Sequence, residues 1–328
     1  MRKRYSEFFI AFYSYLVPMI IYRGDFSTAD NNRSVELEEI RRVRIAGIDF
    51  DRMKLEQVFY ASKDGTKVPM YIVSRKDAKR DGSNAMLLHG YGGFNVSYLP
   101  DFSVSRLCLI QHFGASYAIA NLRGGDEYGE DWHRAGILSK KQNVFDDFIA
   151  AAEYLIANKY TSPKRLAIQG GSNGGLLMAA CSQQRPDLFG AVINNVGVLD
   201  MLRFHKFTIG SAWISEYGNP DKAEDFEYIY KYSPLHNLHL ENGQQFPATL
   251  LLTADHDDRV VPSHTLKYIA QLYHLLKTEA TWQRNPILAR IDVKAGHGGG
   301  KPTSKVIAEC VDVYCFLERV LNLEWKDK

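Results

Sequence analysis

The stretch from residue 166 to residue 177 constrains the fold more than any other part of this 328-residue sequence. It starts as an apolar run, passes through the pattern Gly-x-Ser-x-Gly at 170–174, and continues as an apolar helix start. This order predicts a buried strand that turns sharply into a helix, with Ser172 at the turn. Only small residues fit at positions 170 and 174 of so tight a turn. Ser172 is therefore predicted to be a nucleophile at a helix N-terminus, where backbone N–H groups favour developing negative charge.

Short apolar runs alternate with helix-period segments on both sides of this stretch. Such alternation indicates an α/β fold with a mostly parallel central sheet and helices on both faces. Before it, the Asp64-Gly65 pair predicts an antiparallel hairpin, so the sheet should start antiparallel. The segment at 200–246 is aromatic-rich and irregular, which favours a cap over a site. Strands are predicted at 43–45, 58–60, 68–73, 86–88, 117–120, 165–169, 191–195, 249–253 and 290–293, and helices at 145–157, after 174 and at 305–321.

A serine hydroxyl needs a base, and the base needs an orienting acid. In sheets with this turn the acid and the histidine follow the serine, in that order. His297 follows the last predicted strand and is flanked by glycines, so it is the candidate base. Asp255, Asp257 and Asp258 all follow the strand before it, and spacing alone does not separate them.

The same loops permit other interpretations that the residues disfavour. Adjacent residues such as those at 255–258 cannot all converge on one metal ion, so no metal is expected. The glycine-rich stretch 296–301 ends in Lys301-Pro302, where a phosphate-binding loop requires Ser or Thr after the lysine. No cofactor is therefore expected.

The sequence His-Gly-Tyr-Gly-Gly-Phe at 89–94 follows an early predicted strand, where this kind of fold takes one oxyanion donor. The backbone N–H of Asn173 is one candidate donor. The other is either a backbone N–H of this loop or the Tyr91 hydroxyl, and mechanism alone leaves both open.

Composition limits the remaining function classes. The formal net charge of +2, without a basic run, gives no case for nucleic acid or an anionic membrane. Four dispersed cysteines suit a reducing compartment, which predicts a cytoplasmic protein, and Cys310 and Cys315 are expected to be buried. The apolar stretch 8–22 after Arg2, Lys3 and Arg4 resembles a signal segment, but its length and Pro18 favour two short strands.

The sequence closely resembles the prolyl oligopeptidase family. The resemblance rests on HGYGGF at 89–94, NLRGGDEYGEDWH at 121–133, GGSNGGLL at 170–177, ADHDDRVVP at 254–262 and AGHGGGKPT at 295–303. With KDGTKVPM at 63–70 and YSPLHN at 232–237 it covers nearly the whole chain. It implies an α/β-hydrolase fold and a serine peptidase that cuts short peptides after proline.

The resemblance also implies individual roles. It makes Ser172 the nucleophile, His297 the base and Asp257 the orienting acid, with Tyr91 and the Asn173 N–H at the oxyanion. Trp213 matches the residue that stacks on the substrate proline, an apolar ring that an aromatic face recognises well. Phe94, Val198 and Tyr217 match the rest of that pocket, and Arg259 matches an arginine that holds a substrate carbonyl.

Finally, the resemblance implies a domain organisation. Residues 1–26 are expected to be a remnant of the last propeller blade, and 27–328 the catalytic domain. Most of the β-propeller and the N-terminal segment of the family pattern have no counterpart in this sequence. Short proline-containing peptides are the expected partners, and no required protein partner is evident. The rivals are a peptidase or esterase of other specificity, and a truncated, inactive form that acts by binding.

Overall fold

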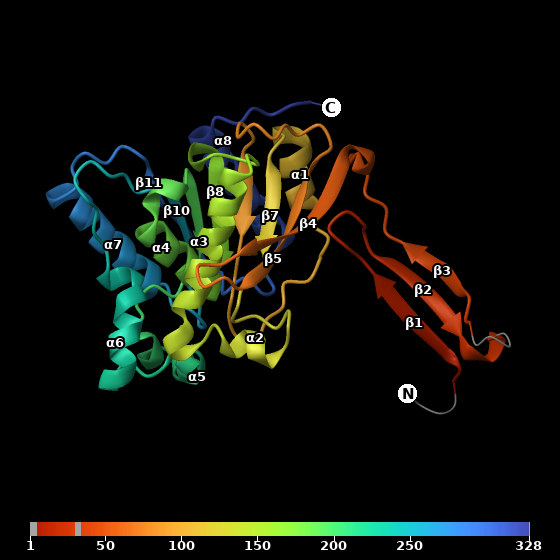
Figure 1. Ribbon diagram of the computed structural model, residues 1–328, viewed down its shortest axis with the longest axis horizontal. Helices are drawn as coiled ribbons and strands as arrows, with labels where there is room; N and C mark the ends of the chain where they lie inside the picture. Colours follow the sequence, from red (N-terminus) through yellow and green to blue (C-terminus); the bar gives the residue numbers. More distant parts are fainter. Residues whose placement is uncertain (1–4, 30–33, 328) are drawn as a thin grey trace.

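An eight-stranded sheet forms the centre of the computed structural model, which describes residues 5–29 and 34–327 (Figure 1). The strand order is β11-β10-β9-β8-β6-β7-β5-β4. Strands β6 to β11 pair in parallel, whereas β5 pairs antiparallel with both β4 and β7. The strands are β4 (Met53–Ala61), β5 (Lys67–Arg75), β6 (Met86–His89), β7 (Ser116–Ala120), β8 (Leu166–Gly171), β9 (Ala191–Asn195), β10 (Ala248–Ala254) and β11 (Ile287–Asp292).

This sheet confirms the predicted α/β fold with an antiparallel start. The central strands β7 and β9 are almost entirely buried, as expected for strands covered on both faces. The parallel strands all present their carboxyl ends at one edge, and the loops that follow β6, β8, β10 and β11 meet there. Binding sites of open α/β sheets form at this edge.

Helices cover both faces of the sheet (Figure 1). One core holds apolar side chains such as Phe148 of α3 (Gln142–Ala157) and Leu177 of α4 (Asn173–Gln184). The other core holds Ile110 of α1 (Val104–Phe113) and Leu317 of α8 (Thr303–Leu321). Helix α7 (Ser263–Thr278) builds a third cluster near the β11 end. Helices α1 and α7 were not predicted from the sequence.

The aromatic-rich segment at 200–246 is more helical than predicted. It contains α5 (Ile214–Tyr217) and α6 (Ala223–Tyr232), joined to short 3-10 turns. Helix α2 (Glu130–Arg134) lies in the segment that follows β7. In Figure 1, α2, α5 and α6 all lie at the same end of the sheet.

A separate three-stranded antiparallel sheet extends from the main body (Figure 1). Its strands are β1 (Glu7–Phe12), β2 (Ile20–Asp25) and β3 (Leu37–Arg42). The first two confirm the predicted strand pair, but β3 at 37–42 lies just before the strand predicted at 43–45, and residues 43–45 form no strand. Every residue of β3 is exposed, so the sequence of β3 shows no alternation of apolar and polar residues that would have predicted its pairing with β2. The predicted boundary at 26/27 stays a prediction, and Arg2, Lys3 and Arg4 lie outside the described residues.

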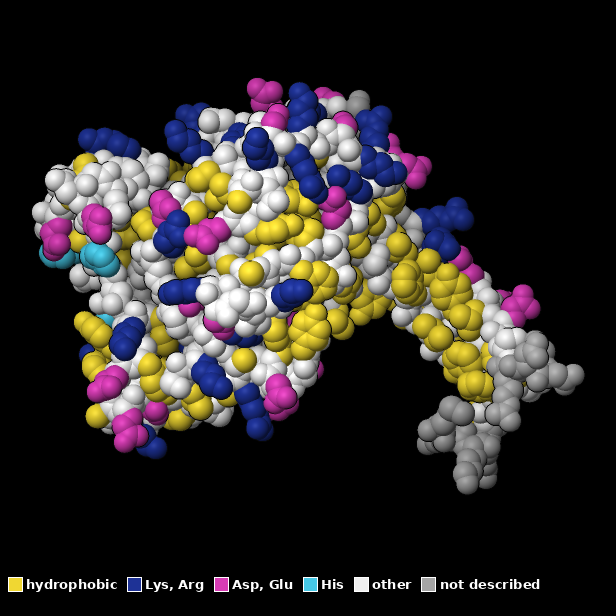
Figure 2. Space-filling model, viewed as in Figure 1, with side chains coloured by type: hydrophobic (Ala, Val, Ile, Leu, Met, Phe, Trp, Pro, Cys, Tyr) yellow, Lys and Arg dark blue, Asp and Glu magenta, His cyan; other side chains and the backbone are white. Residues whose placement is uncertain are grey.

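Apolar side chains are exposed along this small sheet (Figure 2). Phe9 is 61% exposed and Phe12 50%, whereas Tyr15 in the turn between β1 and β2 is buried against the main body. An apolar sheet of this kind without a covering layer is unusual in an isolated domain.

The cysteines differ from the sequence prediction. Cys310 is half-buried and Cys315 is exposed, although both were expected to be buried. A separation of five residues turns a helix by about 140°, so the two thiols on α8 face different directions. All four cysteines are free, and none of the helices in the described residues is long and apolar enough to span a membrane.

Candidate active site

Ser172 occupies the turn between β8 and α4. Its φ of 59° and ψ of −117° place it in a strained backbone region, as the Gly-x-Ser-x-Gly pattern predicts. A Cβ on Gly170 would lie 2.5 Å from the Gly174 carbonyl oxygen, and one on Gly174 would lie 2.7 Å from that of Gly90. Both glycines are therefore required by close backbone contacts, and the serine is presented at the carboxyl edge of the sheet.

His297 and Asp257 meet on two neighbouring loops. His297 Nδ1 lies 2.7 Å from Asp257 Oδ2, and the Asp257 carboxylate is fully buried. Asp257 Oδ1 accepts hydrogen bonds from the backbone N–H groups of Arg259 at 3.0 Å and Val260 at 2.9 Å. Asp255 and Asp258 are exposed, and Asp255 instead contacts His256. Of the three candidate acids, the structure thus brings Asp257 to the histidine.

One cavity of about 330 Å³ joins Ser172 and His297. Within the described residues no hydrogen bond links the Ser172 hydroxyl to the imidazole, although both side chains line this cavity. Such contacts are often long in unliganded sites and shorten when substrate binds. A second cavity of about 340 Å³ is also lined by Ser172 and His297, together with other residues of the loop that carries His297.

Tyr91 and Asn173 lie next to the serine. Asn173 is the first residue of α4, so its backbone N–H has no acceptor within the helix. Its side-chain amide donates to the Tyr91 carbonyl oxygen at 2.7 Å and accepts from the Tyr217 hydroxyl at 2.9 Å. Burial raises the pKa of the Tyr91 phenol to about 12, so it stays protonated and can donate at neutral pH. Tyr91 also lines the cavity with Ser172.

Aromatic rings form one wall of the cavity. Phe94 packs edge-on against Trp213, with ring centroids 6.4 Å apart, and against Tyr217 at 5.5 Å. Buried Phe204 stacks on Trp213 at 6.3 Å and so supports its ring. The remaining predicted pocket residues, Val198 and Arg259, also line this cavity. All predicted site residues thus lie at or beside this cavity.

Ile209 also lines the cavity but was not predicted from the sequence. It is exposed and lies in a segment with no distinguishing pattern.

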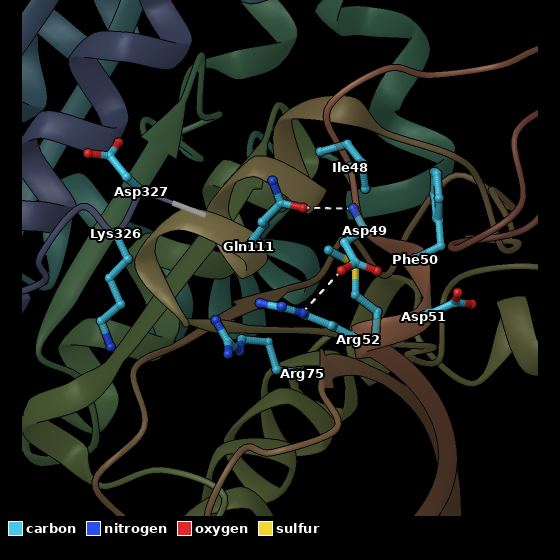
Figure 3. Close-up of a pocket in the computed structure, with 10 residues that line it drawn as sticks. Ile48, Asp49, Phe50, Asp51, Arg52, Arg75, Gln111, Lys326 and Asp327 are labelled. Atoms are coloured by element: carbon cyan, nitrogen blue, oxygen red, sulfur yellow. Dashed lines mark hydrogen bonds and ion pairs between the residues drawn. The ribbon is translucent and has the colours of Figure 1, made fainter.

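A larger cavity of about 690 Å³ lies elsewhere, between the 48–53 segment, α1 and the C-terminal residues (Figure 3). In it Gln111 accepts a hydrogen bond from the Asp49 backbone N–H, and Arg52 pairs with Asp49. None of the predicted site residues lines it. Among the residues that the structure describes, no group of three or more His, Cys, Asp or Glu side chains is placed to hold a metal ion.

Comparisons with known proteins agree with this architecture. Residues 100–324 match the family model described as the prolyl oligopeptidase family. The chain is 48% identical over 322 residues to a prolyl oligopeptidase of Omphalotus olearius. The aligned region is 98% of this chain and 42% of that relative. It is similar to a structure from an analysis of two prolyl endopeptidases, with TM-score 0.89 and 48% identity over 97% of this chain and 45% of that one. It is also similar to a structure of prolyl oligopeptidase B of Galerina marginata bound to a 35-residue substrate, with TM-score 0.92 and 43% identity. That match covers 99% of this chain and 44% of the Galerina chain.

A serine on a strand-to-helix turn of this sheet, with a histidine and an aspartate on later loops, places the chain in the class of α/β-hydrolase folds. The chain belongs to the prolyl oligopeptidase family. It spans less than half the length of the curated relatives that it matches.

Proposed function

We propose that this chain is a serine-type endopeptidase that hydrolyses short peptides on the carboxyl side of proline. The observation that carries the proposal is the single cavity of about 330 Å³ that joins Ser172 and His297 to an aromatic wall. Family membership supports a peptide substrate. Free cysteines suit a reducing compartment, and on this ground a cytoplasmic location is part of the proposal.

In the first step Ser172 Oγ attacks the carbonyl carbon of the scissile bond. His297 Nε2 accepts the serine proton, and Asp257 holds the imidazole with its other nitrogen protonated. The carbonyl oxygen becomes an oxyanion, which accepts hydrogen bonds from the Tyr91 hydroxyl and the Asn173 N–H. The C–N bond then breaks, and His297 gives its proton to the departing amine. The products of this step are a free amine and an ester between Ser172 and the substrate acyl group.

A water molecule completes the cycle. It attacks the ester carbon while His297 accepts one of its protons, and the same donors hold the second oxyanion. The bond to Ser172 Oγ breaks, the serine regains its proton from His297, and the carboxylic acid leaves. Ordinary acid–base chemistry by these side chains accounts for each proton.

The proposed specificity comes from the aromatic wall. A proline ring is rigid and apolar and its nitrogen carries no proton within a peptide, so a ring face binds it without a hydrogen-bond partner. Trp213, stacked on Phe204 and flanked by Phe94, offers such a face beside the nucleophile. Arg259 lies at the rim, where its guanidinium can hold a substrate carbonyl.

Labelling of the purified chain with a fluorophosphonate probe, beside a Ser172→Ala control, tests the triad. We expect labelling that the control abolishes, and faster cleavage of proline peptides than of matched peptides with arginine at the same position. Labelling without proline preference would instead support a peptidase or esterase of other specificity. If the protein folds cooperatively but is not labelled, the result would support an inactive form that acts by binding. The exposed apolar side chains of β1 to β3 favour this rival, because they offer a surface for a partner.

A further inference from the structure

A buried ion pair lies beneath the loop that carries Tyr91. Lys141, just before α3, is 1% exposed, and Glu216 on α5 is 3% exposed. The Lys141 ammonium lies 3.5 Å from Glu216 Oε1. Neither residue lines the cavity with Ser172, and the proposed reaction uses neither of them.

Each member of the pair also holds the backbone of this loop. Lys141 Nζ donates a hydrogen bond to the Gly92 carbonyl oxygen at 2.9 Å, and Glu216 Oε1 accepts one from the Phe94 N–H at 2.9 Å. Gly92 has a φ of 63° and Phe94 a φ of 55°, and such conformations are costly for a bulky residue. The pair thus fixes a strained turn between the candidate oxyanion donor Tyr91 and the pocket residue Phe94.

The other contacts of the pair reach the rest of the site. Glu216 Oε2 lies 2.9 Å from His133 Nε2 of α2. Lys141 Nζ lies 5.4 Å from the centre of the Tyr217 ring, within range of a cation–π interaction. Tyr217 in turn donates to Asn173, the first residue after the nucleophile. The same buried charges therefore contact the oxyanion loop and the aromatic wall.

Stability alone gives a weak reason for such a pair. Two buried charges lose their hydration, and well-packed apolar residues in the same space are often as stable or more stable. Burial lowers the pKa of Lys141, whereas the nearby Glu216 carboxylate opposes that shift and favours the charged form. What an apolar pair cannot supply is a donor for the Gly92 carbonyl and an acceptor for the Phe94 N–H at fixed positions.

We propose that Lys141 and Glu216 are positioning residues that hold the 91–94 loop so that Tyr91 meets the developing oxyanion. The inference rests on the proposed function, in that it needs Tyr91 to act at the oxyanion. His133 acts with them by fixing the second oxygen of Glu216.

The test compares Lys141→Met, Glu216→Gln and the double variant, each with similar side-chain volume. Either single change leaves a buried group without its partner, so both single variants should unfold at lower temperature. The double variant removes both charges and should recover part of that stability, although the Gly92 carbonyl still lacks its donor. Its fluorophosphonate labelling rate should nevertheless stay at least about tenfold below wild type, since the loss of one oxyanion contact costs about that much or more. Arg185→Met with Glu153→Gln, an exposed pair joined at 2.5 Å, is the matched control and should label within twofold of wild type.

A Tyr91→Phe background separates positioning from general packing. If the pair acts through the Tyr91 hydroxyl, the double change should lower labelling of Tyr91→Phe by less than twofold. An unchanged tenfold loss in that background would overturn the proposal, as would a double variant that labels like wild type.

Amide hydrogen exchange of the loop gives a readout that does not need activity. Exchange of the peptide that spans 90–96 should be faster in the folded double variant than in wild type. If wild type itself does not label, the proposed function fails, and the exchange result still decides whether the pair positions the loop. Unchanged exchange would then overturn the inference.

Discussion

Asp257 Oδ2 lies 2.7 Å from His297 Nδ1, while the other oxygen of the same carboxylate accepts two backbone N–H groups. The two loops that carry these residues follow β10 and β11, which pair in parallel register from Thr249 and Ile287 onward. The carboxylate is therefore fixed by its own loop and fixes the imidazole of the next one. This arrangement sets the tautomer that leaves Nε2 free to accept a proton.

Asp257→Asn should lower the fluorophosphonate labelling rate by about 10⁴-fold, because an amide can stabilise the wrong histidine tautomer. The amide nearly matches the carboxylate in size, so the protein should stay folded. Rates of labelling at fixed probe concentration, with circular dichroism as a check of folding, measure this.

Asp255→Asn is the matched control, because Asp255 lies two residues away and contacts His256 rather than His297. It should change labelling by less than about threefold, as surface substitutions usually have small effects. Equal losses in both variants would contradict the assignment of Asp257.

Tyr91→Phe removes a hydroxyl and keeps the ring that packs beside Tyr98 at 5.7 Å. If the phenol donates to the oxyanion, acylation should slow by about 10²–10³-fold. The melting temperature should change little, since no described residue forms a hydrogen bond with this hydroxyl. Single-turnover kinetics with a chromogenic peptide would measure the rate, and Tyr98→Phe serves as the control. A Tyr91→Phe rate close to wild type would assign the second oxyanion contact to a backbone N–H.

Trp213→Leu tests the aromatic wall. Loss of the flat ring should lower kcat/KM for proline peptides about 10–100-fold, the scale expected for a lost ring contact plus its buried area. Labelling by a small fluorophosphonate, which does not need that wall, should fall by less than about threefold. Parallel measurement of both reactions separates the two effects. A uniform decrease in both would indicate that Trp213 supports the fold rather than selecting proline.

His264 predicts a pH dependence of stability. It is 1% exposed, its Nδ1 accepts a hydrogen bond from the Asp200 N–H at 3.0 Å, and burial lowers its pKa from 6.5 to about 4. The unfolded chain therefore binds the proton more readily than the folded chain does. The contribution of His264 is complete above pH 6.5 and is lost as the pH falls towards 4, by up to about 1.4 kcal/mol per pH unit.

Urea unfolding between pH 7 and pH 4 measures this loss. His264→Asn retains a side-chain acceptor but does not titrate, so its free energy of unfolding should fall less steeply than that of wild type. Identical slopes for wild type and His264→Asn would contradict the prediction.

The sheet and the strand-to-helix turn at Ser172 were predictable from sequence because their signals are local. Apolar runs such as 191–195 and the Gly-x-Ser-x-Gly turn encode burial and backbone geometry within a few residues. Strand β3 was missed because all its side chains are exposed and only backbone pairing with β2 defines it. The burial of Cys315 was predicted wrongly because composition does not give the orientation of a helix.

The α/β architecture, the serine at the strand-to-helix turn and the two loops after β10 and β11 follow from the residue pattern alone. That pattern leaves three aspartates after β10 open, because acids close together on one loop have the same sequence signature; the family resemblance points to Asp257, and the folded chain brings Asp257 to His297. Only the tertiary structure brought Lys141 and Glu216 together beneath the Tyr91 loop. These two residues are 75 positions apart in the chain (216 minus 141). No local periodicity reports such a contact, because it depends on how α3, α5 and the loop after β6 pack against one another.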